Sequence, residues 1–341
     1  MRRVVVLGGE GQLARSIAYV AQSSHNEYVM LSRLEADLCD IASLERAVEC
    51  ADVVVNCAAY TNVEAAEDDY DGALRVNALG VKNLAQICLS RSLPLMHIST
   101  DYVFGGDAER TTPYLESDVV APINAYGRSK AEGERALLDS GCGVVIRTSW
   151  LYSPWCKNFC RTILSHSAER NVLSVVDDQR GVPTSALSLA RFIVRIIDEE
   201  FISSMRGIYH FTDLGDATWC DFARAIVELS GHDCRVDACT TQERAMRAPR
   251  PSYSVLGSER LNETNTTLTP WRDALREAIV ACRGEEERYI TEGFCKAGDR
   301  VLLVMPQDKA APKGRLIQPQ VQTIRELLDR GCIPICCTPD R

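Results

Sequence analysis

The sequence has no run of about 18 uncharged apolar residues, the length that a membrane-spanning helix requires. Its N-terminus also lacks the apolar core of a secretory signal peptide and begins directly with a strand-like pattern. We therefore expect the protein to work in the cytoplasm, without a membrane partner.

Excess positive charge is lacking as well. There are 38 Lys and Arg against 47 Asp and Glu, which gives a formal net charge of −9. A protein that binds nucleic acid normally needs a basic face, so the composition disfavours a nucleic-acid partner and leaves small metabolites open. The length of 341 residues favours about two domains.

Metal-binding patterns are also missing: there is no H-x-x-x-H and no paired C-x-x-C, so no metal site is predicted. The 15 cysteines are scattered through a long chain without an export signal, which predicts buried thiols rather than disulfides. Cys332, Cys336 and Cys337 lie in or beside an apolar strand pattern and are interpreted as core thiols. His97 and His210 lie within strand patterns and are expected to be packed or hydrogen-bonded rather than catalytic.

Short, almost continuously apolar segments alternate with helical patterns in the first half of the chain. The apolar segments predict strands covered on both faces, at residues 3–8, 28–31, 52–57, 93–99 and 143–149. The helical patterns cover residues 11–22, 66–90 and 125–138. This order predicts an α/β fold with a doubly wound parallel sheet of the Rossmann type, which binds ligands at the carboxyl ends of its strands.

The first strand ends in GGEGQLA, residues 8–14, which fits the pattern G-x-x-G-x-x-A. Such glycines let the backbone approach a pyrophosphate, although a plain turn can show the same pattern. After the second strand stand Ser32 and Arg33, which suit a 2′-phosphate and favour NADPH over NADH. A solvated loop is the alternative for this pair. Asp37 and Leu38 are expected to flank the adenine.

The stretch NAYGRSKAEGE, residues 124–134, puts Tyr126 and Lys130 on one face of a helix. A lysine one turn from a tyrosine is expected to lower the pKa of the phenol and make it a usable general acid. Thr100 and Asp101 end the fourth strand and are placed to meet a substrate, unless they only cap the next turn. The set predicts proton donation to an oxygen that gains charge as hydride reaches carbon.

An ordered series of motifs reaches from the glycine loop to about residue 282. Besides the two stretches above it comprises NCAAYTNVEAAE, VNALGVKNLA, HISTDYVFGG, PYLESD, IRTSWLY, NFCRTIL, LSVVDDQRGVPTS, GIYHFTD, RPSYSVL and LTPWRDAL. This series resembles the extended short-chain dehydrogenase/reductases, and within them the dTDP-4-dehydrorhamnose reductases. The resemblance implies NADPH-dependent reduction of a nucleotide-linked 4-keto sugar. It also implies a homodimer, in some members with Mg²⁺ at the dimer contact, for which no ligand is identifiable.

By that resemblance Tyr126 is the proton donor, Lys130 holds the nicotinamide ribose and tunes Tyr126, and Thr100 adjusts the tyrosine. With Arg33, Thr61, Tyr126 and Lys130, the residues that would hold the cofactor are Gly8, Gly11, Gln12, Leu13, Ser32, Asp37, Leu38, Ala59 and Tyr60. The residues that would line the sugar site are Thr61, Val63, Thr100, Asp101, Tyr102 and Trp150. Taken without the resemblance, Trp150 could equally be a core tryptophan.

We expect an NADP-binding domain at residues 1–150, a partly interleaved substrate-binding part at 151–282, and an extra strand-helix-strand segment at 283–341. The extra segment resembles part of the dimerisation region of the hydrogenase-maturation GTPase. Its two apolar strand patterns, RVLLVM and CIPICC, and its helix pattern at 320–328 are expected to lack partner strands of their own. No G-x-x-x-x-G-K-[ST] loop for GTP occurs in the chain.

Two other functions compete with the reductase. A non-catalytic, NADP-binding regulatory subunit of the methionine adenosyltransferase type is built on the same fold and can keep Thr100, Tyr126 and Lys130. The third hypothesis is an assembly module defined by residues 283–341. The intact set of three residues favours the enzyme.

Overall fold

The computed structural model describes residues 1–286, 298–304, 323–324, 327–328 and 332–337. The chain divides into two compact units, residues 1–279 and 280–341. Because the first unit is compact throughout, the expected domain boundary at residue 150 stays a prediction.

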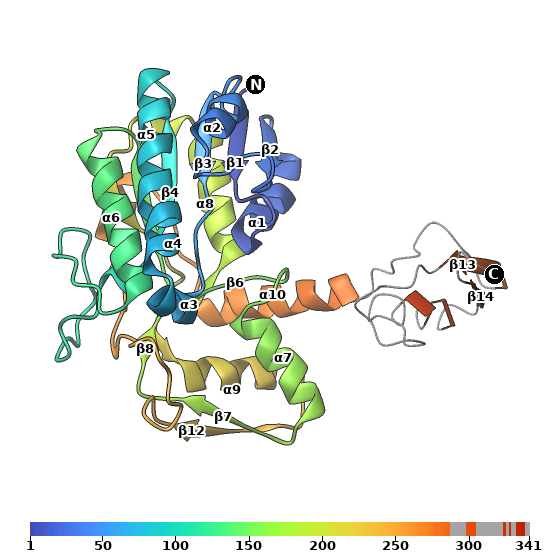
Figure 1. The fold of residues 1–341 in the computed structure, drawn as a ribbon. Helices are drawn as coiled ribbons and strands as arrows, with labels where there is room; N and C mark the ends of the chain where they lie inside the picture. Colours follow the sequence, from blue (N-terminus) through green and yellow to red (C-terminus); the bar gives the residue numbers. More distant parts are fainter. Residues whose placement is uncertain (287–297, 305–322, 325–326, 329–331, 338–341) are drawn as a thin grey trace. The chain divides into compact units, whose positions relative to one another are not determined.

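A sheet of six parallel strands forms the centre of the first unit (Figure 1). Its order is β10-β5-β4-β3-β1-β2, so the chain reverses direction across the sheet between β1 and β3. The strands are β1 (Arg3–Leu7), β2 (Glu27–Leu31), β3 (Val53–Asn56), β4 (Leu95–Thr100), β5 (Val144–Thr148) and β10 (Gly207–His210). The five predicted strands and the doubly wound fold class are thus confirmed. In such sheets the crevice at the reversal point, here beside β1 and β3, binds ligands.

Helices cover both faces of the sheet because successive residues of its strands point to opposite sides. In β1, Val4 and Val6 pack in one apolar core, whereas Val5 and Leu7 pack in the other. The first core contains helices α1 (Gln12–Val20) and α8 (Ala186–Asp198), and the second contains α2 (Ile41–Ala47), α5 (Val81–Ser90) and α6 (Ala125–Asp139). This explains why the strands are apolar throughout rather than alternating.

The single helix predicted at residues 66–90 is wrong in one respect, because the segment is broken. It consists of α3 (Val63–Asp68), α4 (Tyr70–Leu74), a π-helical turn (Arg75–Gly80) and α5. Asp69 ends α3 and caps α4 by accepting from the Gly72 N–H. The π-helical turn directs the buried Asn77 inward, where it bonds both backbone groups of Tyr60. The break therefore fixes the loop that follows β3.

A smaller lobe of the first unit lies below the sheet in Figure 1. It contains α7 (Phe159–Glu169), β7 (Val172–Val176), α9 (Trp219–Ser230), β12 (Arg235–Cys239) and α10 (Trp271–Glu286). Strands β7 and β12 pair in parallel, and α7, α9 and α10 share one apolar core with them. The chain returns from this lobe to the sheet as α8 and β10.

In the second unit, β13 (Arg300–Val304) and β14 (Ile333–Cys337) pair in parallel. The two predicted strands are confirmed, but the expectation that they lack partners is wrong, because each is the partner of the other. Of the helix predicted at 320–328, residues 323–324 and 327–328 are helical and the rest lies outside the described residues.

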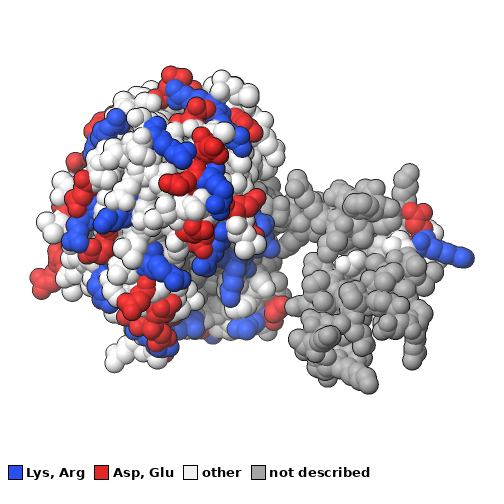
Figure 2. Space-filling view, turned by 45° about the horizontal axis from the view of Figure 1, so that its top comes forward, with Lys and Arg blue, Asp and Glu red and all other residues white. Residues whose placement is uncertain are grey.

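Cys88, Cys142 and Cys220 are buried thiols, as expected, whereas Cys50 is exposed. Figure 2 shows acidic and basic side chains interspersed over one face of the first unit. Among the described residues, no helix combines the length and apolar character needed to cross a bilayer.

An ion pair in the interior joins α6 to the sheet. Arg147 of β5 and Glu134 of α6 have side chains that are 2% and 3% exposed, and Arg147 Nη2 lies 2.7 Å from Glu134 Oε2. Arg147 Nε also donates to both carboxylate oxygens, and its guanidinium lies over the Phe104 ring. Since Tyr126 and Lys130 lie on the same helix, this pair fixes the position of both.

We predict that Arg147→Met destabilises the first unit by about 3–5 kcal/mol, because it leaves the Glu134 carboxylate buried without its partner. Urea unfolding measures the change. The exposed pair Arg135–Glu132 on the same helix is the control, and Arg135→Met should change stability little. Equal effects of the two substitutions would contradict this reading.

We also predict that a chain ending at Arg283 keeps the fold of the first unit, since the α10 residues in the apolar core of the smaller lobe, Trp271, Leu275, Ala278 and Ile279, all precede this end. Its thermal midpoint by circular dichroism should equal that of the full chain. A midpoint lower by more than about 4 °C would mean a loss of more than about 1 kcal/mol and would show that the first unit depends on the rest of the chain.

Candidate active site

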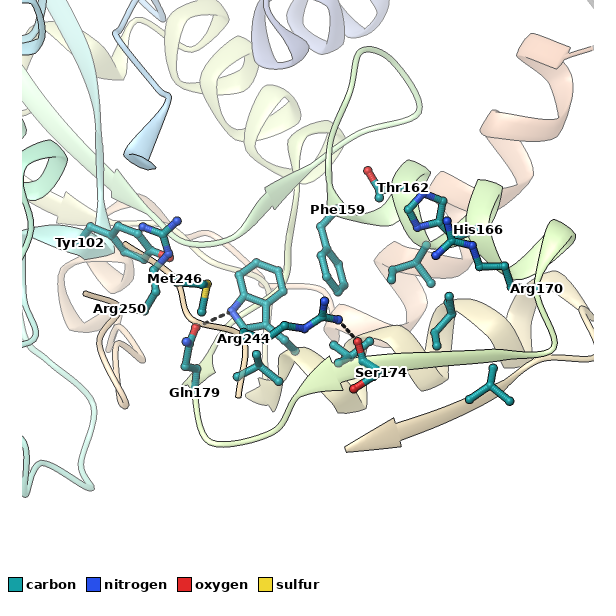
Figure 3. A pocket seen from close by; sticks show the side chains of 16 residues that line it. Tyr102, Phe159, Thr162, His166, Arg170, Ser174, Gln179, Arg244, Met246 and Arg250 are labelled. Atoms are coloured by element: carbon teal, nitrogen blue, oxygen red, sulfur yellow. Dashed lines mark hydrogen bonds between the residues drawn. The ribbon is translucent and has the colours of Figure 1, made fainter. Parts of the chain in front are cut away.

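Three cavities adjoin one another at the carboxyl ends of the central strands. The first, of about 450 Å³, follows the glycine loop, and the second, of about 540 Å³, contains Tyr126 and Lys130. The third, of about 770 Å³, lies in the smaller lobe (Figure 3). The first two share Gly11, Cys57, Ala59 and Thr61, and the last two share Tyr102, Phe159 and Trp219. The shared linings make one continuous groove from the glycine loop to the smaller lobe.

The glycine loop lies close to the loop after β3. Gly8 has φ +79°, and a Cβ there would lie 2.8 Å from Ala58 Cα, so only glycine fits. The N–H of Gly11 donates to the Gly8 carbonyl, and Gln12 then begins α1. Gln12 Nε2 donates to Leu151 O, while its buried Oε1 has no hydrogen-bond partner among the described residues. The loop therefore presents backbone, a helix N-terminus and an unsatisfied acceptor to the groove.

In the loop after β2, Ser32 makes a contact other than the predicted one to a 2′-phosphate. The backbone N–H and hydroxyl of Ser32 donate to Glu35 Oε2 at 2.8 and 2.7 Å. Arg33 lines the first cavity, and its side chain is 70% exposed, with Nε 3.3 Å from Asp37 Oδ2. Of the predicted phosphate-binding pair, only Arg33 therefore lies in the cavity wall with its guanidinium within reach of a ligand.

The other predicted cofactor residues divide between the two inner cavities. Asp37, Leu38, Ala59, Tyr60 and Thr61 line the first cavity with Gly8 and Gly11, whereas Gln12, Leu13, Tyr126 and Lys130 line the second. The Cys39 N–H donates to Asp37 and, as the main cause, lowers the pKa of that carboxyl. Asp37 is therefore ionised at neutral pH and acts as an acceptor.

Lys130 projects from α6 into the interior. It is 1% exposed, and its Nζ donates to Ile98 O at 2.7 Å and lies 3.2 Å from His97 Nε2. Burial lowers the pKa of Lys130 to about 8, against the opposing effects of Glu134 and Cys57. Lys130 can therefore lose its proton near physiological pH, which an exposed lysine cannot.

The predicted effect of Lys130 on Tyr126 is wrong for this structure. Tyr126 is half-buried in the cavity wall, and the burial of its phenol raises the pKa, with the hydrogen bond to Thr100 opposing this and Asp101 adding to it. The lysine does not offset the shift because its Nζ is directed to the Ile98 carbonyl and His97. Tyr126 therefore keeps its proton at neutral pH, as a proton donor must.

Asp101 stands in the lining of the second cavity and is 2% exposed. Its carboxylate accepts from Ser254 Oγ at 2.6 Å, Thr100 Oγ1 at 3.1 Å and Ser149 Oγ at 3.3 Å. Burial raises the pKa of Asp101 to about 6 despite these donors. The three hydroxyls hold this carboxylate in place, and Asp101 in turn fixes Thr100.

Two stacked indoles form the wall between the second cavity and the smaller lobe. Trp150 and Trp219 have ring centroids 3.6 Å apart and planes 7° apart. Trp150 has φ +45°, and a Cβ on Gly181 would lie 2.5 Å from its ring. Trp219 donates to Gln179 Oε1. Of the other predicted sugar-site residues, Thr61, Val63, Thr100, Asp101 and Tyr102 also line this cavity.

The third cavity combines apolar side chains with arginines, which the sequence analysis missed. Arg170, Arg244 and Arg250 stand in its wall with Phe159 and Trp219 (Figure 3). Arg250 Nη2 lies 2.7 Å from Glu64 Oε1, while its buried Nη1 has no partner among the described residues. Arg170 directly follows α7, whereas Arg244 and Arg250 lie in the loop after β12, so no local motif could connect them. Their guanidinium groups suit an anion such as a phosphate.

No group of three or more metal-ligating side chains occurs in the described part of the chain. The Mg²⁺ ion expected from the resemblance therefore receives no support from the structure.

Comparisons with known proteins agree with this geometry. The family model described as RmlD substrate binding domain matches residues 1–283, and the hydrogen maturase F dimerization domain matches residues 290–340. A dTDP-4-dehydrorhamnose reductase of Mycolicibacterium smegmatis is 39% identical over 287 residues, covering 83% of this chain and 86% of the relative. A dTDP-4-keto-6-deoxy-D-glucose reductase of Streptomyces niveus is 38% identical over 290 residues, covering 83% of this chain and 99% of the relative.

Solved structures give the same result. A dTDP-4-dehydrorhamnose reductase of Clostridium acetobutylicum superposes with a TM-score of 0.77 at 36% identity, covering 82% of this chain and 99% of that one. The Bacillus anthracis enzyme, solved in complex with NADP, gives a TM-score of 0.76 at 32% identity over the same shares of the two chains. Over residues 1–283, this chain belongs to the RmlD substrate binding domain family, the family of the dTDP-4-dehydrorhamnose reductases.

Proposed function

We propose that this protein reduces the 4-keto group of dTDP-4-dehydro-L-rhamnose with NADPH and so forms dTDP-L-rhamnose. One observation carries the proposal: Tyr126, Lys130 and Thr100 meet in a cavity that joins the glycine loop to an arginine-lined pocket. The relatives that carry the names of dTDP-sugar reductases support it. We include in the proposal the homodimer and the cytoplasmic location expected from the sequence.

The residues of the two inner cavities fit a nicotinamide dinucleotide. Gly8 and Gly11 leave room for a pyrophosphate beside the N-terminus of α1, and Arg33 can reach a 2′-phosphate. In the second cavity three buried polar atoms have no partner among the described residues, namely Gln12 Oε1, Ser99 Oγ and Thr148 Oγ1. When bound, NADPH supplies a hydride to the carbonyl carbon.

The chain's own residues then supply and control the proton. Tyr126 donates its phenolic proton to the carbonyl oxygen, which becomes the new hydroxyl. Thr100 lies in the same cavity, where it donates its hydroxyl hydrogen to Asp101 and is held in place by that carboxylate. Lys130 lies in the same cavity and can pass a proton to the phenolate that remains.

The third cavity is our choice for the dTDP part of the substrate. Arg170, Arg244 and Arg250 provide positive charge for a diphosphate, and the apolar side chains around them provide surface for a flat base. Because this cavity shares Tyr102 with the second, a bound nucleotide would extend its sugar toward Tyr126.

The deciding experiment is incubation of the full chain with NADPH and dTDP-4-dehydro-L-rhamnose, with the loss of NADPH followed by its absorbance and the sugar product analysed. The proposal requires loss of NADPH with formation of an equal amount of dTDP-L-rhamnose. NADPH binding without turnover would reject it in favour of a non-catalytic regulatory subunit.

We predict that Tyr126→Phe lowers turnover by roughly 10²- to 10⁴-fold, because the general acid is lost, while NADPH binding by fluorescence titration changes little. Tyr19→Phe is the matched control, since Tyr19 is 53% exposed and packs on Trp155 instead. A Tyr126→Phe variant with the turnover of the control would exclude Tyr126 as the proton donor.

We also predict that Arg33→Ala weakens NADPH by roughly 10- to 100-fold and NADH much less, as expected for a lost charge-assisted hydrogen bond to phosphate. The substitution also leaves the Asp37 carboxylate without its cation. Dissociation constants for both cofactors measure the effect, with the exposed Arg46→Ala on α2 as the control. Equal losses for the two cofactors, or a wild-type preference for NADH, would reject the role of Arg33.

A further inference from the structure

His97 and Asn56 form a buried pair behind the catalytic lysine. They are direct neighbours in the register of β4 and β3, and neither is exposed to solvent. The Asn56 amide nitrogen lies 3.0 Å from His97 Nδ1, and His97 Nε2 lies 3.2 Å from Lys130 Nζ. The line Asn56–His97–Lys130 therefore connects the centre of the sheet to the active site.

The direction of the hydrogen bonds along this line can be worked out from its far end. The backbone N–H of Ala58 donates to Asn56 Oδ1 at 3.0 Å, and a backbone N–H is always a donor. This fixes the orientation of the amide, so that Asn56 Nδ2 donates to His97 Nδ1. A neutral imidazole that accepts at Nδ1 carries its proton at Nε2. The N–H of His97 is consequently directed at Lys130 Nζ.

Only one protonation state of Lys130 gives every donor and acceptor in the hydrogen-bonded chain Asn56–His97–Lys130 a partner. An ammonium group has donors only, so it would meet the Nε2–H of His97 as donor against donor. A neutral amine accepts that hydrogen and still donates to the Ile98 carbonyl. Flipping the Asn56 amide does not make an ammonium group compatible with these hydrogen bonds, because the NH₂ of the amide would then face the N–H of Ala58.

We propose that His97, held by Asn56 in the tautomer protonated at Nε2, is a positioning residue that donates to Lys130 Nζ and favours the neutral amine. This inference rests on the proposed function for its purpose. When the Lys130 ammonium group passes a proton to the Tyr126 phenolate, the neutral amine that remains is the form that His97 stabilises, and a proton from water then restores the ammonium group.

The other groups that face Lys130 act in known directions. Glu134 on α6 favours the ammonium form, although its carboxylate is bound by Arg147 of β5. Cys57 after β3 also favours it, but burial raises the pKa of this thiol to about 12, so the thiol stays neutral. Tyr126 on α6 is neutral as well, because burial raises the pKa of its phenol. Burial lowers the pKa of His97 well below its usual value, so the imidazole does not carry a second proton.

Asn56→Asp tests the proposal by reversing the direction of the hydrogen bonds from residue 56 through His97 to Lys130. A carboxylate at this position accepts from both Ala58 N–H and His97 Nδ1–H, which moves the imidazole proton and leaves Nε2 as an acceptor for the ammonium group. We expect the Lys130 titration midpoint, read from ¹³Cε-lysine NMR, to rise by about one pH unit or more. The pH at which turnover falls to half on the alkaline side should increase by the same amount. The exposed Asn171→Asp adds the same charge in the smaller lobe and should change neither.

The wild-type chain gives the second test, which needs no altered fold. In ¹⁵N-histidine spectra of the full chain, assigned by the signal lost in His97→Gln, His97 should show a bare Nδ1 and a protonated Nε2 from about pH 6 to 9. Asn56→Ala removes the hydrogen bond to His97 Nδ1 without adding charge, so the Nδ1-protonated form of His97 should appear.

A wild-type His97 protonated at Nδ1, or at both nitrogens, would overturn the proposal. Equal titration midpoints of Lys130 in Asn56→Asp and Asn171→Asp would also overturn it. These spectra require no turnover, so a chain that fails to reduce the sugar nucleotide but shows the expected tautomer would reject the proposed function and leave the pairing of His97 with Lys130 in place.

Discussion

The active site depends on how helix α6 is fixed to the sheet. The ion pair of Glu134 with Arg147 and the close approach at Gly133, where a Cβ would lie 2.0 Å from Asn77 O, place this helix against β5 and the π-helical turn. A charge buried on each side makes displacement of the helix costly, because either group alone would be left without water or partner. Tyr126 and Lys130 inherit their positions from this contact, as they lie on the same helix.

The second constraint is the removal of water from the groups that we propose as catalytic and from their neighbours. Burial acts on three groups in the direction that reduction of a carbonyl needs: it keeps the proton on Tyr126, loosens the proton on Lys130 and keeps His97 neutral. The hydrogen bonds that compensate for burial come from strand backbone and from neighbouring strands, such as Ile98 O and Asn56. In this structure the sheet thus supplies both the support and the chemical tuning of the site.

Sequence reasoning predicted the strands, the fold class and the spacing of Tyr126 and Lys130, because these follow from local periodicity. It failed where the outcome depends on contacts between distant segments. The lysine was expected to lower the pKa of the tyrosine, but the direction of its Nζ is set by Ile98 and His97 on another element. Arg244 and Arg250 were missed because their place beside Arg170 appears only in the folded lobe. The hydroxyl of Ser32, which suggested a phosphate contact, donates to the nearby Glu35.

The central claim is that NADPH bound in the groove supplies the hydride to the carbonyl carbon, while Tyr126 supplies only the proton. The most direct measurement uses NADPH that carries deuterium at the transferred position of its nicotinamide C4, with NMR analysis of the sugar product. The account predicts deuterium on carbon 4 of the rhamnose and, from deuterated solvent with ordinary NADPH, none at that carbon. Solvent-derived deuterium at carbon 4, or oxidation of NADPH without label in the sugar, would contradict it.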